Sequence, residues 1–333
     1  MAIKIGINGF GRIGRMVLRS IIENNRKDIE VVAINNRAKS EVSNFLLKHD
    51  TVHGKFEAKL NYSDQSLDIN GKKIAMTHEA EISKIDWKKN KVDVVLECTG
   101  KFNTKEKSAQ HIKSGVKKVL VSAPCKEAIN IVFGVNHNVL KKSDQVISAA
   151  SCTTNCLAPV AHVINEEFGI ERGFMTTIHS YTTDQRLLDN SHKDLRRARS
   201  APNSMIPTTT GATKSLGDVI PSLKDKVEGI SIRVPTPNVS LIEFVFSSNT
   251  NLSAEKINDS FLKASKSKLK NILDTKSEPL VSSDFNHNPH SAIVDLSLTK
   301  VVENKMAKVS AWYDNEWGFA SRMCDLANYF GKI

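Results

Sequence analysis

The chain has 333 residues, more than a single domain usually contains, so we expect two domains that each bury a hydrophobic core. Hydrophobic residues make up 40% and charged residues 25%, which excludes an intrinsically disordered or fibrous chain. The formal charge of +11 arises from 47 Lys and Arg against 36 Asp and Glu, and it leaves open nucleic acid, a membrane surface or a small anion as partner.

Membrane and export signals are absent from the sequence. No apolar run approaches the roughly 20 residues of a membrane span, and the N-terminus lacks the pattern of a signal peptide. The five cysteines are an odd number without a Cys-x-x-Cys pair, which favours reduced thiols. We therefore predict a cytoplasmic protein without a membrane partner. Most lysines are scattered, as on a solvated surface, whereas Arg196, Arg197 and Arg199 cluster in a polar loop.

The N-terminal segment predicts one βαβ unit. The apolar run from Ile3 to Ile7 is a strand candidate, and Ile29 to Ile34 is a second one. Between them, Gly9, Gly11 and Gly14 form a Gly-x-Gly-x-x-Gly pattern, and apolar residues then recur at helical spacing. A strand, a glycine turn, a helix and a parallel strand make up a Rossmann unit.

Further strand candidates divide the chain into two parts. Several of those in the first part are apolar enough for a parallel sheet covered on both faces; they are Val92 to Cys98, Lys117 to Ser122, Ile129 to Val135 and Gln145 to Ala149. Those in the second part are long, with few helices between them: Phe174 to His179, Ile230 to Val234, Val239 to Phe246 and Lys308 to Trp312.

These patterns predict an α/β protein with two domains. Residues 1–151 and 319–333 are expected to form a doubly wound Rossmann domain that binds NAD(P), and the last helix, near Gly318 to Phe330, packs back onto it. Residues 152–318 are expected to form an α+β catalytic domain with a mainly antiparallel sheet and helices on one face.

The glycine pattern predicts a dinucleotide site for NAD or NADP. The first glycine permits a tight turn, the second lets the backbone approach a pyrophosphate, and the third allows close helix packing. The helix N-terminus supplies amide donors and partial positive charge. We assign the cofactor to this loop, which comprises Asn8, Gly9, Phe10, Gly11, Arg12 and Ile13.

The second strand ends without the acid that normally binds both ribose hydroxyls and repels a 2′-phosphate. Ile34 is followed instead by Asn35, Asn36 and Arg37. Asn36 can still hydrogen-bond a hydroxyl, whereas Arg37 either pairs with a phosphate or points into water. This position is therefore compatible with NADP.

Cys152 is the candidate nucleophile. It follows the strand candidate Gln145 to Ala149 and precedes an apolar helical pattern, so it is expected at a helix N-terminus, which favours the thiolate. Cys156, one turn later, is expected to be a buried small hydrophobe. A thiolate that attacks an aldehyde forms a hemithioacetal, and hydride loss to nicotinamide then leaves a thioester.

Such a reaction needs a base for the hydroxyl proton, and histidine suits neutral pH. His179 ends a predicted strand and enters the polar loop from Ser180 to Asp184. Its position alone does not decide between a general base and a structural histidine.

Five segments, spread in order over essentially the whole chain, resemble the phosphorylating glyceraldehyde-3-phosphate dehydrogenase family. They are Ile7 to Arg15, Ser148 to Cys156, His179 to Thr182, Arg233 to Ser240 and Trp312 to Gly318. The resemblance implies reversible oxidation and phosphorylation of glyceraldehyde 3-phosphate to 1,3-bisphosphoglycerate, in glycolysis or gluconeogenesis. It also implies a homotetramer, in which the loop from Tyr181 to Ser204 reaches a neighbouring subunit.

The resemblance also implies roles for single residues. Cys152 matches the nucleophile and His179 the general base. Thr182 and Arg233 match residues that hold the C3 phosphate of the substrate. The residues that match the family's pocket for inorganic phosphate are Ser151, Thr153, Thr210 and Gly211. Arg197 matches an arginine that lies near both anion sites. Asn315 matches the residue that fixes the nicotinamide carboxamide. Other positions that match cofactor-contacting residues are Thr99, Gly100 and Ser122.

The chain departs from the family pattern at two places. NAD-using members usually carry Asp where this chain has Asn36, and Leu-Pro where it has Asn190-Ser191. Similar changes occur in NADP-using, plastid-type members, where the serine lies near the adenosine ribose of an adjacent subunit. Asn36, Arg37 and Ser191 therefore motivate the hypothesis that the enzyme accepts NADP and works in the biosynthetic direction.

Three other interpretations are weaker. An erythrose-4-phosphate dehydrogenase shares most motifs, but that family departs from Tyr181-Thr182, which this chain keeps. A non-catalytic RNA-binding protein would use the basic surface, but every expected catalytic group is present, so nucleic acid is not expected as the main partner. His287 and His290 lack a third ligand and indicate a loop, so no metal is expected.

Overall fold

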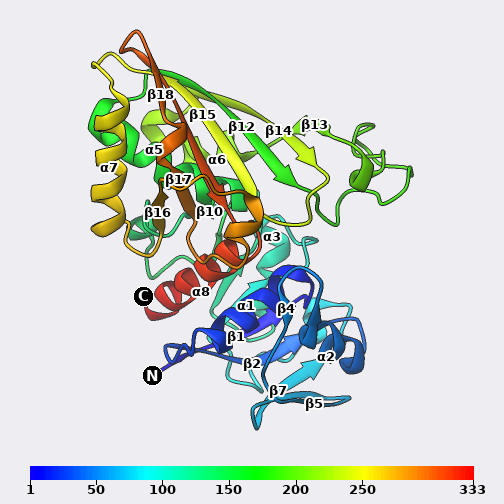
Figure 1. Ribbon diagram of the computed structural model, residues 1–333. Helices are drawn as coiled ribbons and strands as arrows, with labels where there is room; N and C mark the ends of the chain where they lie inside the picture. Colours follow the sequence, from blue (N-terminus) through cyan, green and yellow to red (C-terminus); the bar gives the residue numbers. More distant parts are fainter. The chain divides into compact units, whose positions relative to one another are not determined.

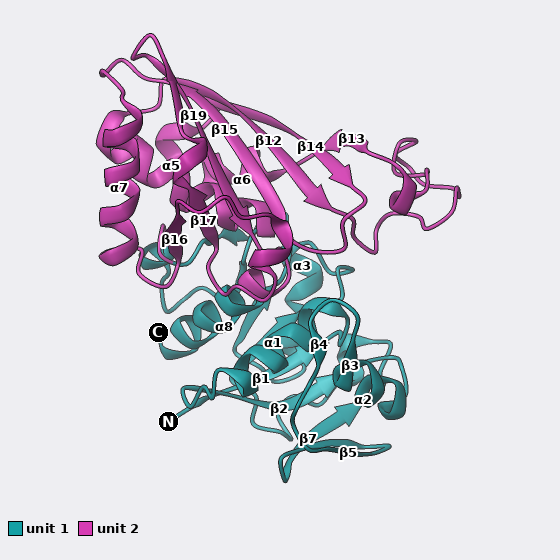
Figure 2. Cartoon of the chain, in the orientation of Figure 1, with its two compact units in different colours: residues 1–133, 137–150, 320–333 teal, residues 134–136, 151–319 magenta.

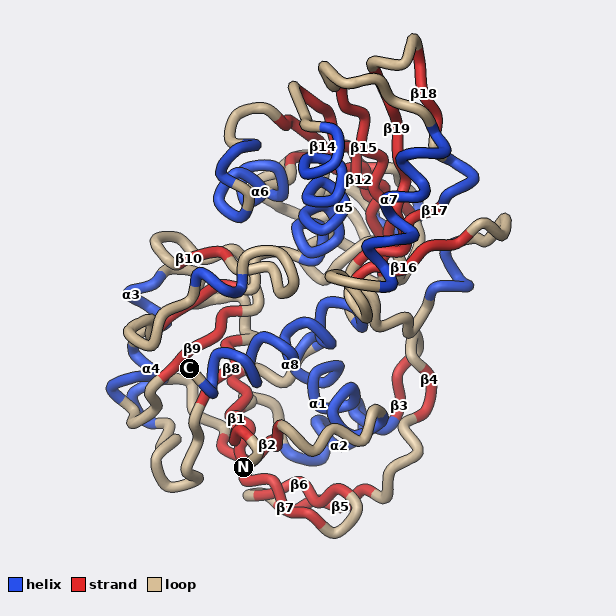
Figure 3. Tube along the Cα trace, turned by 90° about the vertical axis from the view of Figure 1, so that its left-hand side faces the viewer, coloured by secondary structure: helices blue, strands red, loops and turns tan.

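The computed structural model describes residues 1–333 (Figure 1), and none of its helices combines the length and apolar character that crossing a membrane requires. The chain forms two compact units (Figure 2). The first contains residues 1–133, 137–150 and 320–333, and the second contains residues 134–136 and 151–319. Figure 3 shows how helices and strands are distributed in each unit.

The first unit is built on a 9-stranded sheet in the order β10-β11-β9-β8-β1-β2-β7-β6-β5. The strands are parallel from β10 to β7 and antiparallel from β7 to β5. Their bounds are β1 (Ile3–Asn8), β2 (Ile29–Asn35), β5 (Leu60–Ser63), β6 (Ser66–Ile69), β7 (Lys72–Thr77), β8 (Val94–Glu97), β9 (Lys118–Val121), β10 (Ile129–Asn130) and β11 (Val146–Ser148). The predicted doubly wound Rossmann fold is confirmed.

Helices surround this sheet. They are α1 (Arg12–Glu23), α2 (Ser40–Lys48), α3 (Lys105–Ser108), α4 (Gln110–Lys113) and α8 (Trp317–Lys332). The C-terminal part of α8 belongs to this unit, where Arg26 forms an ion pair with Asp325 and the Lys118 ammonium donates to the Phe330 carbonyl. The strands β3 (His49–Asp50) and β4 (Gly54–Lys55) form a separate small sheet.

Two sequence predictions in this unit need correction. The strand predicted from Ile129 to Val135 is only β10, since the chain turns at Gly134, whose φ is +90°. Strands β5 to β7 were not predicted, although Asn70 and Gly71 mark the turn between β6 and β7. Both turn residues have positive φ, as a two-residue hairpin turn requires.

The second unit contains an 8-stranded sheet in the order β13-β14-β12-β15-β19-β17-β16, with β18 paired to β19. All pairs are antiparallel except β12 with β14 and β16 with β17. The bounds are β12 (Arg172–Ser180), β13 (Ile206–Thr209), β14 (Val227–Val234), β15 (Ser240–Ser247), β16 (Leu273–Lys276), β17 (Ala292–Asp295), β18 (Lys300–Val302) and β19 (Met306–Tyr313). The predicted mainly antiparallel sheet is confirmed.

Three helices cover one face of this sheet, namely α5 (Cys152–Phe168), α6 (Ala212–Val219) and α7 (Ala254–Lys266), as Figure 1 shows. Alternate residues of β15 are buried, including Ile242, Phe244 and Phe246, as expected for a strand with one covered face. On neighbouring strands Phe174 and Ile230 are exposed. Short 3-10 helices occupy Ile82–Lys84, His137–Val139, Ala201–Asn203, Pro221–Leu223, Ser282–Phe285 and Leu296–Leu298.

Candidate functional site

The glycine loop of the first unit joins the end of β1 to the start of α1. Gly9 has φ +92°, and a Cβ there would lie 2.8 Å from the Thr99 amide nitrogen. A Cβ on Gly14 would lie 2.3 Å from the Gly9 carbonyl oxygen, so only glycine allows this helix to pack so closely. At Gly11, which precedes the first residue of α1, the same direction is open space. The loop thus leaves a free approach to the first amides of the helix.

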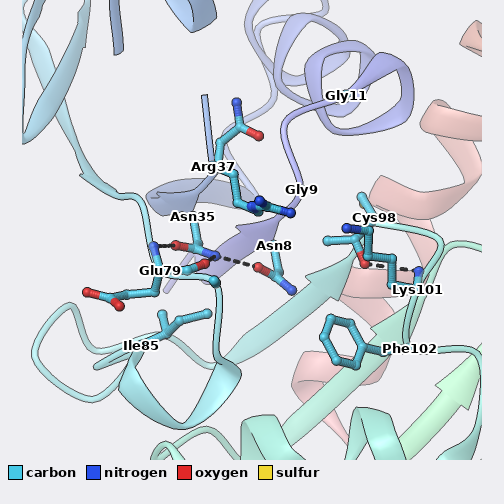
Figure 4. Close-up of a pocket in the computed structure, with 13 residues that line it drawn as sticks. Asn8, Gly9, Gly11, Asn35, Arg37, Glu79, Ile85, Cys98, Lys101 and Phe102 are labelled. Carbon is cyan, nitrogen blue, oxygen red and sulfur yellow. Dashed lines mark hydrogen bonds between the residues drawn. The ribbon is translucent and has the colours of Figure 1, made fainter. Parts of the chain in front are cut away.

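A hollow of about 260 Å³ adjoins this loop (Figure 4). Its walls come from the loop and from the carboxyl ends of β2, β7 and β8, where ligands bind in doubly wound sheets. The lining residues are Asn8, Gly9, Gly11, Asn35, Asn36, Arg37, Glu79, Ala80, Ile85, Cys98, Thr99, Lys101 and Phe102. The predicted residues Asn8, Gly9, Gly11, Asn36, Arg37 and Thr99 are therefore brought together.

Other predicted cofactor residues lie outside this lining. Phe10 is buried, and the Arg12 guanidinium pairs with the Asp50 carboxylate. Ser122 hydrogen-bonds Cys98, which itself lines the hollow. Ser191 belongs to the second unit, on an exposed loop. Ile13 and Gly100 are likewise absent from the lining.

Sequence reasoning missed several lining residues, most clearly Glu79 and Phe102. Both stand a few residues beyond a strand, after β7 and β8 respectively. The shared position beyond the carboxyl ends of parallel strands was the available signal. The side chain of Asn35 holds this wall, because its Nδ2 donates to Asn8 Oδ1 at 2.8 Å and to the Glu79 carbonyl at 3.0 Å (Figure 4).

In the second unit, Cys152 is the first residue of α5. Ser151 is the N-cap, and its Oγ accepts a hydrogen bond from the Thr154 amide at 3.0 Å. The Cys152 sulfur lies 3.5 Å from His179 Nε2, near the end of β12. His179 Nδ1 lies 2.7 Å from the Ser180 carbonyl, which only accepts, so Nδ1 carries the proton and Nε2 offers its lone pair to the sulfur.

Burial and charge set the protonation of this pair. Burial raises the pKa of Cys152, while the positive charge of Arg233 and hydrogen bonds from Thr153 act in the opposite direction. Burial, followed by the Arg233 charge, lowers the pKa of His179 to about 3. Burial therefore opposes the thiolate that the helix start favours. In this geometry the Cys152 thiol can donate a hydrogen bond to the lone pair of His179 Nε2.

Arg233 stands beside the pair, since it is the register partner of His179 on β14. Its Nη1 donates to Thr182 Oγ1 at 3.2 Å and to the Ser180 carbonyl at 3.3 Å. Its Nε is buried and has no hydrogen-bond partner. A buried donor without a partner is costly, so this nitrogen is an unsatisfied polar atom beside the thiol. The structure thus brings together the two residues predicted for the C3 phosphate.

Arg197 lies near the same pair. Its Nε donates to Thr208 Oγ1 at 3.0 Å, and its Nη1 contacts an Asp184 carboxylate oxygen at 2.7 Å. The charge of Arg197 lowers the pKa of both His179 and Arg233, where burial is the largest cause. Arg197 is therefore the arginine of its cluster that acts on the thiol site.

The remaining predicted phosphate ligands have other partners. Thr153 Oγ1 lies 2.9 Å from the Tyr313 hydroxyl, and Thr210 Oγ1 accepts from the Ala212 amide at 3.2 Å. Gly211 is the N-cap of α6. Tyr313, which sequence reasoning missed, also contacts Thr177 Oγ1 at 2.8 Å and ties α5 to the sheet. The only indication of Tyr313 in the sequence was its place directly before Asp314 and Asn315.

Asn315 is buried and has a defined amide orientation. Its Oδ1 accepts from Ser180 Oγ and from Ser240 Oγ, both at 2.9 Å. Since both hydroxyls use the oxygen, the Nδ2 group is directed away from them. Apart from this site, the ring of His287 stacks on Trp317 and His290 Nδ1 lies 3.0 Å from Asn288 Oδ1.

Comparisons with known proteins agree with this architecture. The family model described as the glyceraldehyde 3-phosphate dehydrogenase NAD binding domain matches residues 3–105, and the model of the C-terminal domain of the same enzyme matches residues 151–315. The first of these models supports a nicotinamide cofactor.

Curated relatives match over the full length. A glyceraldehyde-3-phosphate dehydrogenase of Cereibacter sphaeroides is 52% identical over 100% of both chains, and one of Xanthobacter flavus is 51% identical over 100% of both. Glyceraldehyde-3-phosphate dehydrogenase 2 of Bacillus subtilis is 49% identical over 99% of this chain and 97% of its own. The chain therefore belongs to the glyceraldehyde-3-phosphate dehydrogenase family.

Proposed function

We propose that this chain catalyses the reversible oxidation and phosphorylation of glyceraldehyde 3-phosphate to 1,3-bisphosphoglycerate, with NAD or NADP as the hydride acceptor. The observation that carries the proposal is the 3.5 Å contact between the Cys152 sulfur and His179 Nε2, beside the partly unpaired Arg233 guanidinium. The names of the full-length relatives support the same activity.

Cys152 and His179 perform the proton and bond changes. His179 Nε2 accepts the thiol proton as the sulfur bonds to the aldehyde carbon, and the Cys152 amide at the start of α5 stabilises the oxyanion. The protonated His179 returns this proton to the oxyanion, which gives the hemithioacetal. His179 Nε2 then takes the hydroxyl proton again as the hydride leaves the carbon, so a thioester remains. A phosphate oxygen attacks the thioester carbon, and the Cys152 sulfur leaves as thiolate, which takes back the proton held on His179 Nε2.

Two anions must lie near this sulfur. We assign the C3 phosphate of the substrate to Thr182 and Arg233, because the Arg233 Nε is buried without a partner. Inorganic phosphate is assigned to Ser151, Thr153, Thr210 and Gly211, with Arg197 between both anions. Hydroxyls and amides at the starts of α5 and α6 favour an anion there.

The first unit serves as the NAD(P)-binding domain and the second as the catalytic domain. The open side of Gly11 and the positive φ of Gly9 fit a pyrophosphate on the loop. When bound, the nicotinamide accepts the hydride from the substrate carbon. Asn315, whose amide orientation Ser180 and Ser240 define, holds its carboxamide. The other assigned contacts are Asn8, Phe10, Arg12, Ile13, Thr99, Gly100 and Ser122.

The enzyme accepts NADP as well as NAD. At the carboxyl end of β2, Asn36 and Arg37 line the hollow, where no carboxylate follows the strand to repel a 2′-phosphate. Asn36 Nδ2 donates to Ser43 Oγ at 3.0 Å, which leaves its oxygen as acceptor for a ribose hydroxyl. Ser191 is assigned to the ribose of an adjacent subunit, as in NADP-using relatives.

Replacing Asn36 by Asp should move cofactor preference toward NAD. The new carboxylate accepts both ribose hydroxyls and repels the 2′-phosphate, so the ratio of kcat/KM for NAD over NADP is expected to rise about 10-fold or more. Asn61→Asp, on the exposed strand β5, is the matched control and should leave the ratio unchanged. A wild-type preference for NAD above about 100-fold would contradict NADP use.

The chain acts as a homotetramer in the cytoplasm. The uncovered sheet face exposes Phe174 and Ile230, and the loop between β12 and β13 exposes Leu187, Leu188 and Leu195, which suit contacts between subunits. All five cysteines are unpaired, as in a reducing compartment.

The test of this function compares NAD and NADP reduction with glyceraldehyde 3-phosphate, with and without phosphate or arsenate. We expect turnover that depends on either anion. Turnover without them would contradict acyl transfer to phosphate, and faster turnover of erythrose 4-phosphate would reassign the substrate.

A further inference from the structure

A buried carboxylate lies behind the dinucleotide hollow without lining it. Glu97 is the last residue of β8, and its side chain is completely buried. Its Oε1 accepts from the Thr99 amide at 2.8 Å and from the Thr99 hydroxyl, while its Oε2 accepts from Asn8 Nδ2 at 2.6 Å. His111 Nε2 lies 3.0 Å from the same Oε2. A buried carboxylate is tolerated only when donors satisfy it in this way.

His111 is a hydrogen-bond donor to the Glu97 carboxylate. The Trp87 indole nitrogen, which can only donate, lies 3.0 Å from His111 Nδ1. Nδ1 must therefore accept, and the ring is the neutral tautomer that donates from Nε2 to Glu97. Trp87 and His111 are themselves fully buried, so this support is shielded from solvent.

The carboxylate fixes the direction of a chain of hydrogen bonds that runs from β8 through β1 and β2 to β7. Because Glu97 only accepts, Asn8 must turn its Nδ2 toward it and its Oδ1 toward Asn35 Nδ2, at 2.8 Å. Asn35 Oδ1 then faces the Thr77 hydroxyl and the Glu79 amide, both at 2.9 Å. Glu97 therefore sets the side-chain orientation of Asn8 and Asn35, which line the hollow, although Glu97 does not line it.

Thr99 transmits the same constraint to the glycine loop. The Thr99 amide and Cγ2 both lie 2.8 Å from where a Gly9 Cβ would stand, so Gly9 is packed against Thr99. A displacement of Thr99 therefore displaces the first glycine of the loop that is assigned to the pyrophosphate.

We propose that Glu97 is a positioning residue for the dinucleotide, acting through Asn8 and Thr99 and supported by His111 and Trp87. The inference rests on the proposed function for the identity of the ligand. It predicts that loss of the Glu97 charge weakens dinucleotide binding more than it slows the chemical step.

The test replaces Glu97 by Gln, which keeps the size but removes the charge and one acceptor. Binding of NAD and of NADP to the full-length protein is titrated by fluorescence, and kcat is measured at saturating cofactor. We expect the dinucleotide Kd to rise about 10-fold or more, since bonds to a charged acceptor are lost, with kcat changed less than about threefold.

The matched control is Asp93→Asn. Asp93 Oδ2 accepts from the Lys4 amide at 2.8 Å and joins β8 to β1 at the opposite ends of the same strands. It is expected to affect thermal stability only, with the dinucleotide Kd within about twofold of wild type. If Glu97→Gln does not fold, His111→Gln provides the second variant, with an expected Kd increase of about threefold or more.

An unchanged Kd in the folded Glu97→Gln variant, or in His111→Gln if the former does not fold, would overturn the proposal. An equal rise in Asp93→Asn would do so as well, because it would indicate a general structural effect. Failure of the proposed function is separate: wild-type protein that binds dinucleotide but does not oxidise glyceraldehyde 3-phosphate would refute that function and leave the Kd comparison intact.

Discussion

The dinucleotide hollow of the first unit is lined by side chains that bind one another, whereas the thiol site of the second unit keeps a polar atom free. Asn8 and Asn35 line it and bind each other, and Glu97 behind them accepts from Asn8. Arg233 Nε, by contrast, is buried without a partner beside Cys152. The side chains around the hollow thus hold one another in place, whereas the thiol site contains a donor that no protein group satisfies.

The largest expected effect concerns the sulfur itself. Cys152→Ser should lower kcat by at least about 1,000-fold, because a hydroxyl is a far weaker nucleophile, while the dinucleotide Kd stays within about twofold. Cys156→Ser, one turn further along α5 and fully buried, is the control and should retain most activity. Equal losses of kcat in both variants would contradict Cys152 as the nucleophile, and a raised dinucleotide Kd in Cys152→Ser would remove the distinction between the two units.

His179→Gln should have the next largest effect. The amide keeps a polar group near the sulfur but cannot take its proton, so kcat is expected to fall by about 100- to 10,000-fold. His162→Gln, at a partly buried histidine of α5 beside Glu166, is the control and should retain most activity. Cofactor titrations of both variants should match wild type, and a weakened affinity in His179→Gln would show that the thiol site is not a separate functional part.

Arg233→Gln probes the free donor. The KM for glyceraldehyde 3-phosphate should rise by about 10- to 100-fold, and that for unphosphorylated glyceraldehyde much less. Since the Arg233 charge counteracts the rise that burial causes in the pKa of Cys152, its removal should also move alkylation of that thiol to higher pH. Equal KM changes for both aldehydes would exclude Arg233 from the C3 phosphate site.

The smallest expected effect separates two arginines of one loop. Arg197→Gln should raise the KM for inorganic phosphate by roughly 10-fold. Arg199→Gln removes only an exposed pair with Asp189, so its KM should stay within about twofold. The KM for inorganic phosphate is measured in both variants. A larger increase in Arg199→Gln than in Arg197→Gln would assign the phosphate contact to Arg199.

The two regions also differ in how far the sequence predicts them. The glycine loop is local, so the strand, turn and helix around Gly9, Gly11 and Gly14 follow from spacing alone. Cys152 at a helix start was predictable for the same reason. Residues near one another only in the fold were not, since the Glu97 network and the Tyr313 bridge join segments distant along the chain. The strands β5 to β7, which form one end of the sheet, were missed although Asn70 and Gly71 mark the turn between β6 and β7.

Trapping the acyl-enzyme tests the central claim most directly. Enzyme mixed with glyceraldehyde 3-phosphate and excess NAD or NADP, without phosphate, should release a single burst of reduced cofactor, close to one equivalent per Cys152, and then stop. Mass spectrometry should place an acyl group on Cys152, and adding phosphate should restart turnover. Continuous turnover without phosphate, or a burst of the same size in Cys152→Ser, would contradict the account.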